Sequence, residues 1–271
     1  MKKPRSKLGQ VFLKDKNILD KIVRYSDVKQ DEWILEIGPG RGALTEFLLT
    51  HGAKVIAFEI DPSLVAELKK SFGLLLNDRF FLVEKDFLKV DVGKELETRS
   101  IFVPIKIVSN IPYYITTPII TKLIETRNLY SEIYLTIQKE VAERIVAKPG
   151  TSEYGSLTLY LKMFFDVDIL FNIPRTCFKP VPKVDSSFVR FKVRENPPID
   201  VEDAGFLEKL IRLSFGGRRK KLKTVLRNNF GRLPFSDIET TSGISLDRRG
   251  ETLSLEEFEQ LARAVKKILK K

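Results

Sequence analysis

The sequence contains very little cysteine and histidine. Its 271 residues include one cysteine, Cys177, and one histidine, His51. A single cysteine excludes a framework of intrachain disulfides, and the two residues cannot form the His/Cys cluster that a structural zinc site needs. A disulfide-stabilised domain and a zinc module are therefore excluded, and we expect no bound metal. His51 follows an apolar helical pattern and is predicted to cap a helix, whereas Cys177 is predicted to pack.

Long apolar runs are also missing. The basic N-terminus, MKKPRSKLGQVFLKDKN, lacks the run of roughly 7–15 apolar residues that a secretory signal has. The most apolar region, residues 101–121, is interrupted by Lys106, Asn110 and three prolines, so it is a poor membrane span. These features predict a cytoplasmic protein that does not enter a membrane.

Acidic residues are in the minority. Lys and Arg number 47 against 36 Asp and Glu, which gives a net charge of +11 and a pI near 9.5. Such a charge favours a polyanionic partner, either nucleic acid or an acidic membrane, over a neutral metabolite. The length and the 43% hydrophobic content are sufficient for one large domain and a small one.

Short apolar runs alternate with stretches of helical spacing, which is typical of an α/β fold. The runs that we predict to be strands are Trp33–Ile37, Val55–Phe58, Phe80–Val83, Ile101–Val108, Ile133–Ile137, Val167–Phe171 and Phe188–Val193. This order predicts a largely parallel, doubly wound, Rossmann-like sheet. The paired prolines of RENPPID, residues 194–200, bar both helix and strand, and only helical patterns follow them. We therefore expect a catalytic domain over 1–196 and a small all-helical domain over 197–271.

A glycine-rich turn, EIGPGRGA at residues 36–43, lies where the first of these strands meets a helix. Glycines there let the backbone approach a ligand closely, and the following helix offers free N–H groups. The turn also fits the dinucleotide pattern G-x-G-x-x-G/A, although that match alone is weak. A ligand-binding loop is the favoured interpretation over a simple tight turn.

Two acids follow the next two predicted strands. Glu59 lies about 20 residues after Gly38, the spacing at which a carboxylate accepts the hydroxyl groups of a ribose. Asp86 follows the third strand, where it could accept a hydrogen bond from an adenine amino group. Together with the glycine turn, these acids predict an adenosine pocket at the carboxyl edge of the sheet. Both a nicotinamide cofactor and S-adenosylmethionine would fit it.

The stretch SNIPYY, residues 109–114, decides between these two cofactors. Asn110 offers an acceptor oxygen, the Ile111 carbonyl a second one, Pro112 a rigid backbone and Tyr113 a flat ring. Such a loop suits the exocyclic amine of adenine, whose nitrogen attacks well only when acceptors hold its hydrogens. An amine held in line with a sulfonium methyl group needs orientation and electrostatics more than a strong base. The loop therefore favours S-adenosylmethionine and methyl transfer over hydride transfer.

In this order, LEIGPGRGALT at 35–45, Glu59, Asp86 and SNIPYYIT at 109–116 resemble the rRNA adenine N6,N6-dimethyltransferases, which are class I S-adenosylmethionine-dependent enzymes. Four more segments narrow the resemblance to the small-subunit branch: KLGQVFL at 7–13, QKEVAERIVAKPGTSEYGSLT at 138–158, FKPVPKVDSSFVRF at 178–191 and SFGGRRKKLKTVLRN at 214–228. The resemblance implies dimethylation of two adjacent adenines in the hairpin loop near the 3′ end of small-subunit rRNA. It also implies a role in subunit biogenesis, with a monomer acting on a partly assembled subunit.

The resemblance also implies roles for particular residues. The expected cofactor-binding set is Val11, Leu13, Glu36, Gly38, Gly40, Glu59, Ile60, Asp86, Phe87 and Asn110. The expected catalytic set is Asn110, Ile111, Pro112, Tyr113 and Phe178, with Phe178 stacking on the adenine opposite Tyr113. One departure is visible, since the family usually has Asn or His at the position of Val11. At Val11 we therefore expect the cofactor to be contacted by the backbone or by packing of the side chain.

A basic segment in the helical region points to the RNA. Residues 218–227, RRKKLKTVLR, hold six basic residues and no acid, while Leu222, Val225 and Leu226 recur at helical spacing. We predict an amphipathic helix that presents Arg218, Arg219, Lys220, Lys221 and Lys223 to phosphates. The segment KKPRSK at 2–7 is expected to add a flexible basic arm.

Two alternative functions remain open. A large-subunit rRNA adenine methyltransferase of the resistance type would share the cofactor and the NIPY-like loop, but it should lack KPGTSEYG and FGGRRKKLK. A non-catalytic relative could act as a ribosome-assembly or transcription factor through the same surface. Intact Glu59, Asp86 and NIPY favour a catalyst over that second alternative.

Overall fold

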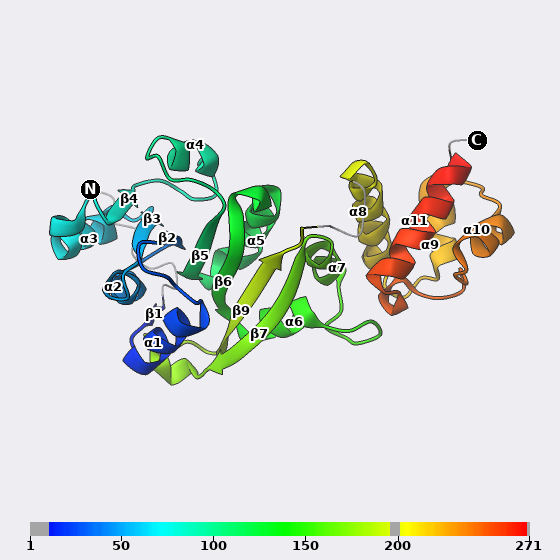
Figure 1. Ribbon diagram of the computed structural model, residues 1–271. Helices are drawn as coiled ribbons and strands as arrows, with labels where there is room; N and C mark the ends of the chain where they lie inside the picture. The colour runs from blue at the N-terminus through cyan, green and yellow to red at the C-terminus, as the bar shows by residue number, and fades with distance from the viewer. Residues whose placement is uncertain (1–10, 196–200, 270–271) are drawn as a thin grey trace, which may run out of the picture. The chain divides into compact units, whose positions relative to one another are not determined.

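A seven-stranded sheet forms the centre of the computed structural model, which describes residues 11–195 and 201–269 (Figure 1). Its order is β4-β3-β2-β5-β6-β9-β7. The strands are β2 (Trp33–Ile37), β3 (Lys54–Phe58), β4 (Phe80–Val83), β5 (Ile105–Asn110), β6 (Tyr130–Gln138), β7 (Phe165–Ile173) and β9 (Ser186–Val193). Pairing is parallel from β4 through β6, and β9 is antiparallel to β6. The predicted α/β fold with a largely parallel sheet is confirmed.

The expected strand at Ile101–Val108 is shifted in the structure. β5 begins only at Ile105 and continues through Asn110. Pro104 immediately precedes the strand and has no N–H to donate to a neighbouring strand, so the ladder begins after it. The shift brings Asn110 onto the last position of a strand rather than into a loop.

Helices cover both faces of the sheet. α1 (Lys16–Tyr25), α2 (Ala43–Thr50) and α3 (Pro62–Phe72) contribute to one apolar cluster with residues of the strands, among them Ile34, Val55 and Val108. α5 (Thr116–Glu125) connects β5 to β6, and α4 (Val92–Glu97) precedes β5. From β2 the chain adds β3 and β4 on one side of the sheet, and it then adds β5 and β6 on the other side of β2. Because parallel crossovers are right-handed, this reversal of strand order places α5 on the opposite face of the sheet from α2 (Figure 1).

Local sequence signals explain where these helices begin and end. The side chain of Asp15 accepts hydrogen bonds from two backbone N–H groups of α1, and Asp61 caps α3 with Pro62 at the first helical position. His51 caps the C-terminus of α2, as expected. Cys177 is buried. The short 3-10 helices are η1 (Gly73–Leu75), η2 (Tyr113–Ile115), η3 (Arg127–Leu129), η4 (Arg175–Cys177) and η5 (Gly250–Thr252).

A separate two-stranded ribbon joins the N-terminal part to the segment after β7. β1 (Phe12–Leu13) pairs antiparallel with β8 (Phe178–Lys179), with Leu13 opposite Phe178. The backbone N–H of Lys14 also donates to the carbonyl of Cys177 at 2.9 Å. The ribbon therefore fixes β1, which reaches the functional pocket described below.

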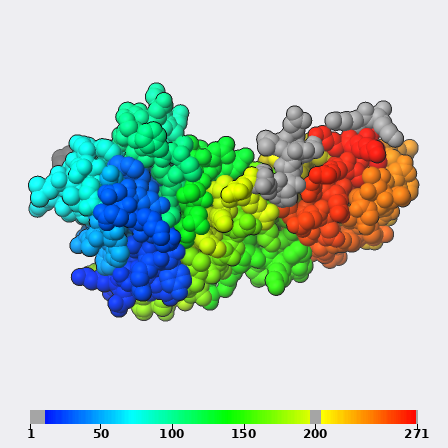
Figure 2. Space-filling model, viewed as in Figure 1, coloured from blue at the N-terminus to red at the C-terminus, as the bar shows by residue number. Residues whose placement is uncertain are grey.

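The chain divides into two compact units. The first holds residues up to 142 together with 168–193, and the second holds 143–167 together with the chain from 194 onward. The second unit contains the second half of α6 (Lys139–Val146), then α7 (Ser156–Lys162), α8 (Val201–Gly216), α9 (Leu222–Phe230), α10 (Phe235–Ser242) and α11 (Leu255–Leu269). Figure 2 shows the side chains of α10 and α11, in orange and red, in contact on the visible face.

The division differs in one respect from the one expected at residue 196. Residues 143–167, which include the first three residues of β7, group with the helices of the second unit. Tyr154 is buried in this segment, and its hydroxyl donates to the carbonyl of Leu253 at 2.8 Å. Most of the expected linker, RENPPID, lies outside the described residues.

Membrane-spanning helices and metal clusters are both absent from residues 11–195 and 201–269. No helix in that part of the chain is long and apolar enough to cross a bilayer. Nor do three or more His, Cys, Asp or Glu side chains gather there in a way that could hold a metal ion.

Candidate active site

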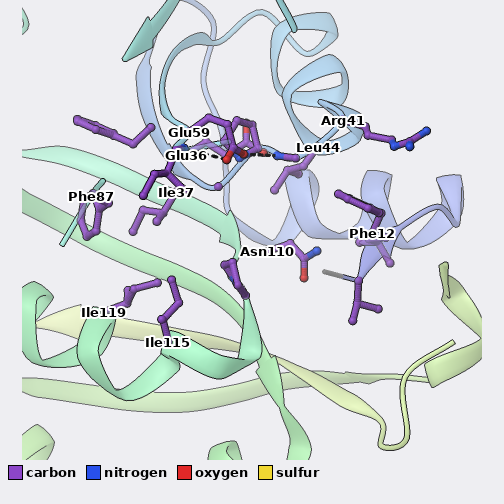
Figure 3. A pocket seen from close by; sticks show the side chains of 18 of the residues that line it. Phe12, Glu36, Ile37, Arg41, Leu44, Glu59, Phe87, Asn110, Ile115 and Ile119 are labelled. Carbon is purple, nitrogen blue, oxygen red and sulfur yellow. Dashed lines mark hydrogen bonds between the residues drawn. The ribbon is translucent and has the colours of Figure 1, made fainter. Parts of the chain in front are cut away.

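A pocket that is partly open to solvent lies at the carboxyl ends of β2, β3 and β5 (Figure 3). The loops that follow these strands and β4 provide most of its wall. All ten expected cofactor residues line it: Val11, Leu13, Glu36, Gly38, Gly40, Glu59, Ile60, Asp86, Phe87 and Asn110. Segments that lie far apart in the sequence therefore meet at one edge of the sheet.

The glycine turn adopts a backbone that other residues rarely take. Gly38 and Gly40 have φ angles of +66° and +60°. A Cβ atom added at Gly40 would lie 2.8 Å from the ring of Phe12, which is too close for a carbon contact. At Gly38 the added atom would meet Pro112 at 3.5 Å. The glycines thus allow the turn, β1 and the Asn110 loop to pack together around the pocket.

Glu59 ties the turn to β3. One carboxylate oxygen accepts the N–H groups of Ile60 and Asp61, each at 2.9 Å, and the other accepts the N–H of Gly40 at 3.2 Å. The side chain is 5% exposed. Burial raises the pKa of Glu59, and these three hydrogen bonds oppose the rise. A carboxylate has about four acceptor positions, so one remains for a ligand hydroxyl.

Glu36 is the more deeply buried of two adjacent acids. It is 1% exposed, and the hydroxyl of Thr45 donates to it at 2.6 Å. Burial, with a further contribution from the charge of Glu59, raises the pKa of Glu36 to about 8. Glu36 therefore carries a proton at neutral pH in the protein alone. Figure 3 shows Glu36 and Glu59 side by side on one wall of the pocket.

Asp86 follows β4 on the same edge of the sheet. One of its oxygens accepts the N–H of Leu88 at 3.0 Å, and the other lies 3.9 Å from the ammonium group of Lys89. About a quarter of the side chain is exposed. Asp86 lines the pocket, and its carboxylate oxygens can still accept hydrogen bonds from an amino group there.

Asn110 carries a polar atom with no partner. Its Oδ1 is buried and makes no hydrogen bond to the described residues, and the same is true of Oγ1 of Thr136, which occupies the paired position on β6. A buried acceptor without a donor costs on the order of 1–3 kcal/mol, and at the wall of a pocket such an atom is a candidate ligand contact. In Figure 3 the amide of Asn110 lies below the two glutamates, between Ile115 and Phe12.

Comparisons with known proteins agree with this geometry. The family model described as ribosomal RNA adenine dimethylase matches residues 1–267. The chain belongs to the ribosomal RNA adenine dimethylase family. Two relatives are named ribosomal RNA small subunit methyltransferase A: one from Lactococcus lactis, 43% identical over 96% of this chain and 90% of its own length, and one from Geobacillus, 41% identical over 98% and 92%.

Two solved structures share the fold. A dimethyladenosine transferase from Plasmodium falciparum has a TM-score of 0.74 and 30% identity, over 92% of this chain and 95% of its own. The 23S rRNA methyltransferase ErmE has a TM-score of 0.70 and 25% identity, over 94% of this chain and 99% of its own. The likeness to both extends through the sheet and the helices that follow it.

This family uses S-adenosylmethionine, and the pocket fits that cofactor. Glu59 has one acceptor position left for a ribose hydroxyl. The glycine turn leaves open the volume that a side chain at Gly40 would fill, and Asp86 offers a second acceptor. The Glu59 carboxylate at one wall of the pocket suits a ligand that carries a sulfonium cation.

The structure separates the expected catalytic residues into two groups. Asn110 and Pro112 line the pocket, whereas Ile111 and Tyr113 lie outside its walls. The hydroxyl of Tyr113 instead shares a hydrogen bond of 2.6 Å with Ser186. The neighbouring Tyr114, which sequence reasoning did not single out, lines the pocket and is half exposed. Sequence alone does not show which of two adjacent tyrosines of a 3-10 turn faces a pocket.

Phe178 was expected to stack on the target base. In the structure its side chain is fully buried, belongs to the apolar cluster beneath β1 and does not line the pocket. The stacking role of Phe178 stays a prediction. In this structure Phe178 anchors β1 through its position opposite Leu13, and β1 in turn supplies Phe12 and Leu13 to the pocket.

Sequence reasoning missed several pocket residues besides Tyr114. They are Phe12, Leu19, Ile37, Pro39, Arg41, Ala43, Leu44, Phe58, Lys85, Leu88, Ile115 and Ile119. Phe12 was detectable in principle, because it lies between the expected contacts Val11 and Leu13. Val11 does line the pocket, as expected for a contact through packing.

The basic segment is only partly the predicted helix. α9 begins at Leu222, with Leu222, Val225 and Leu226 buried, so residues 218–221 precede it. Arg218 donates to Glu251 at 3.0 Å and to the carbonyls of Ser152 and Tyr154 at 3.1 Å. Arg218 therefore links segments of the second unit, although 42% of its side chain is exposed to solvent. Lys221 and Lys223 both contact Asp247, at 3.0 and 3.4 Å.

Two basic residues of this segment stay unpaired. Arg219 and Lys220 form no ion pair with any residue of the ranges 11–195 and 201–269, and both are exposed. Of the six basic residues of the segment, Arg218 is held by hydrogen bonds, two lysines share an acid, and Arg219 and Lys220 have no ion pair in the described part of the chain. The sixth, Arg227, lies over the ring of Phe235. The expected basic arm at 2–7 lies outside the described residues.

The raised pKa of Glu36 predicts how stability depends on pH. Between the ordinary value near 4.5 and about 8, the folded protein holds a proton that the unfolded chain has lost, so stability falls as pH rises through this window. Glu36→Gln cannot ionise, so this variant should not show the fall in stability that Glu36 causes as pH rises. Urea unfolding of the ligand-free protein should show the variant gaining about 1–3 kcal/mol on the wild type between pH 5 and pH 8.5.

The matched control is Glu46→Gln, which removes an exposed carboxyl from α2 and should track the wild type at every pH. If the Glu36→Gln and wild-type curves ran parallel between pH 5 and pH 8.5, Glu36 would be ionised in the folded protein and the description of its environment would be wrong.

Proposed function

We propose that this protein transfers methyl groups to N6 of two adjacent adenines in the hairpin loop near the 3′ end of small-subunit rRNA, and so takes part in small-subunit biogenesis. The observation that carries the proposal is the buried, unpartnered Oδ1 of Asn110 beside a pocket that fits S-adenosylmethionine. Two relatives above 40% identity carry the name small subunit methyltransferase, which supports the choice of RNA.

Each residue of the pocket would have a separate role in cofactor binding or methyl transfer. S-adenosylmethionine supplies an electrophilic methyl group when it is bound. Glu59 holds the ribose hydroxyls, Asp86 accepts the amino group of the cofactor adenine, and the glycine turn lets the backbone approach closely. Asn110 Oδ1 and the Ile111 carbonyl accept the two hydrogens of the target amine, which directs the nitrogen lone pair toward the methyl carbon. Orientation and electrostatics thus replace a strong base.

Tyr113 is proposed to stack on the target base from outside the cofactor pocket. Its ring is half-buried, and the hydrogen bond to Ser186 fixes its hydroxyl. Pro112 restricts the backbone between Asn110 and this ring. A base extruded from its stack loses stacking energy, and an aromatic face beside the acceptors would restore part of it.

For the RNA surface we propose the basic segment, with roles that follow its ion pairs. Arg219 and Lys220 can bind phosphates without first breaking an ion pair. Lys221 and Lys223 can do so when they leave Asp247, an exposed and hence weak partner. We exclude Arg218 because it is committed to the carbonyls of Ser152 and Tyr154.

We further propose that the substrate is a partly assembled subunit in the cytoplasm, and that the protein works as a monomer without a metal ion. The main alternative is methylation of large-subunit rRNA. The similarity to ErmE supports it at 25% identity, against 43% and 41% for the small-subunit relatives. A purely binding role has no comparable support, because Asn110, Glu59 and Asp86 all line one pocket.

Labelled S-adenosylmethionine tests this proposal directly. The protein is incubated in parallel with undermethylated small subunits, with protein-free small-subunit rRNA and with large-subunit rRNA, and the modified nucleosides are mapped. Dimethyladenosine at two adjacent positions of the small-subunit hairpin is expected, most of it in the subunit sample. Dimethyladenosine confined to large-subunit rRNA would overturn the proposal.

Replacing Asn110 tests the orphaned acceptor. Asn110→Ala should lower kcat by roughly 10²–10³-fold, the usual cost of removing a positioned polar group, while cofactor affinity changes much less. The control is Asn172→Ala, whose amide oxygen accepts the hydroxyl of Ser187 outside the pocket. Turnover by Asn110→Ala at the rate of this control would show that Asn110 has no catalytic role.

Replacing Glu59 tests the cofactor contact without deleting the side chain. Glu59→Gln loses one charged acceptor, so calorimetry should show a dissociation constant for S-adenosylmethionine raised by roughly 10–100-fold, or about 1.4–3 kcal/mol. RNA affinity should not change. Glu46→Gln serves again as the exposed control. Equal cofactor affinities in the two variants would remove Glu59 from the binding site.

Asp247 tests the basic segment. Asp247→Asn frees Lys221 and Lys223, so rRNA should bind a few-fold more tightly at low salt, and the plot of log K against log salt should become steeper by roughly 0.7 for each additional phosphate that these lysines neutralise. The control is Asp237→Asn, which removes the same charge from an exposed position on α10. If both variants bound rRNA more tightly by the same factor, net charge would explain the effect and the basic segment would not be the RNA-binding surface.

A further inference from the structure

The sheet opens between β2 and β5 at the edge where the pocket lies. β2 stays paired with β3 up to its last residue, Ile37, opposite Phe58. Its pairing with β5 stops two residues earlier, at Leu35 opposite Ile107. β5 meanwhile stays paired with β6 as far as Asn110. The two central strands therefore part just before the glycine turn and the Asn110 loop begin.

One hydroxyl group spans this opening. Oγ of Ser109 accepts the backbone N–H of Ile37 at 3.1 Å and donates to the backbone carbonyl of Ile37 at 2.6 Å. Ser109 is 1% exposed, and Ile37 is also buried. Without this hydroxyl, both polar backbone groups of Ile37 would lose the partner that Ser109 provides, and buried backbone groups are rarely left in that state.

We propose that Ser109 is a positioning residue that sets the separation between the cofactor loop and the acceptor of the target amine. Ile37 directly precedes Gly38, and Ser109 directly precedes Asn110. The bridge is therefore one residue away from each of the two loops. Packing beyond the bridge is close, since a Cβ atom at Gly38 would lie 3.5 Å from the ring of Pro112.

The consequence for catalysis follows from geometry. If the opening widened, Asn110 would move with β6, to which β5 stays paired, while the glycine turn would move with β3. The acceptor on β5 and the glycine turn that holds the cofactor would then move apart. Misplacement of reacting groups by about 1 Å can cost on the order of 100-fold in rate.

Loss of the Ser109 bridge would not slow the first and second methyl transfers equally. This part of the inference rests on the proposed dimethylation. The unmodified amine offers two hydrogens to the acceptors that orient it, whereas the monomethylated amine offers one. The second transfer thus has one fewer contact to place the nitrogen and depends more on the spacing of the two loops. Loss of the Ser109 bridge should slow the second transfer more than the first.

The test compares Ser109→Ala with Thr158→Val in the full-length protein. The Thr158 hydroxyl is also buried, accepts the N–H of Gly155 at 3.2 Å and donates to the carbonyl of Arg144 at 2.7 Å, but it does not line the pocket. Each variant is incubated with undermethylated small subunits and labelled S-adenosylmethionine. Rates are divided by the folded fraction, and monomethyladenosine and dimethyladenosine are counted separately.

For Ser109→Ala we expect kcat per folded molecule to fall by roughly 10–100-fold. The affinity for S-adenosylhomocysteine should stay within about 3-fold of the wild type, because the contacts of Glu59 are untouched, and the ratio of monomethyladenosine to dimethyladenosine should rise. Thr158→Val should leave that ratio at the wild-type value. Ser109→Cys keeps the size of the side chain with weaker hydrogen-bonding groups and should shift the ratio in the same direction.

The proposal is overturned if the Ser109 variants that fold keep the wild-type product ratio and the wild-type kcat per folded molecule. It is also overturned if Thr158→Val shifts the ratio as much, because the effect would then reflect general loss of stability. Failure of the proposed function gives a different result, since the wild type itself would then form no dimethyladenosine on the small subunit.

Discussion

The site depends on the parting of β2 and β5 at the carboxyl edge of a parallel sheet. Ligands bind such sheets where the strand order reverses, because the connections there leave in opposite directions and a crevice forms between them. Parting two strands exposes buried backbone groups, and each must find a substitute partner. Here Ser109 supplies that partner for Ile37, and the N–H of Gly38 still donates to the carbonyl of Phe58 at 2.9 Å. The two strands can therefore part without leaving the backbone groups of Ile37 and the N–H of Gly38 unpaired.

Charge in the crevice follows from the same architecture. Glu36 lies within β2 and Glu59 directly follows β3, so the parallel pairing of these strands brings two acids together in a buried place. Backbone N–H groups stabilise the Glu59 carboxylate, whereas Glu36 keeps a proton. A cationic ligand would relieve the cost of this arrangement. The site thus favours a sulfonium cofactor by its electrostatics as well as by its shape.

Much of this could be predicted from the sequence, because local signals specify it. The strands appear as short apolar runs, the glycine turn requires positive φ angles, and Glu59 falls at the spacing typical of a ribose contact. These features depend on residues close together in the chain or on one strand crossover. The α/β fold, the family and the cofactor were accordingly correct.

What the sequence could not show depends on distant contacts. Whether Phe178 faces solvent or β1 is decided by pairing across more than 160 residues. Arg218 has the local pattern of a solvent-facing cation, but the carbonyls of Ser152 and Tyr154 accept its hydrogen bonds. The choice between Tyr113 and Tyr114 depends on Ser186 in β9. Ser109 itself is an ordinary strand residue until β2 and β5 are seen to part.

A crystal structure of the protein with S-adenosylhomocysteine would test the central claim most directly, namely that this opening places the cofactor next to an unpartnered acceptor. The account predicts the ribose at Glu59, the adenine amino group at Asp86, and the sulfur beside Oδ1 of Asn110, with that oxygen still free of any protein donor. A cofactor bound away from the β2–β5 opening, or Asn110 turned so that Oδ1 accepts a hydrogen bond from the protein, would contradict it.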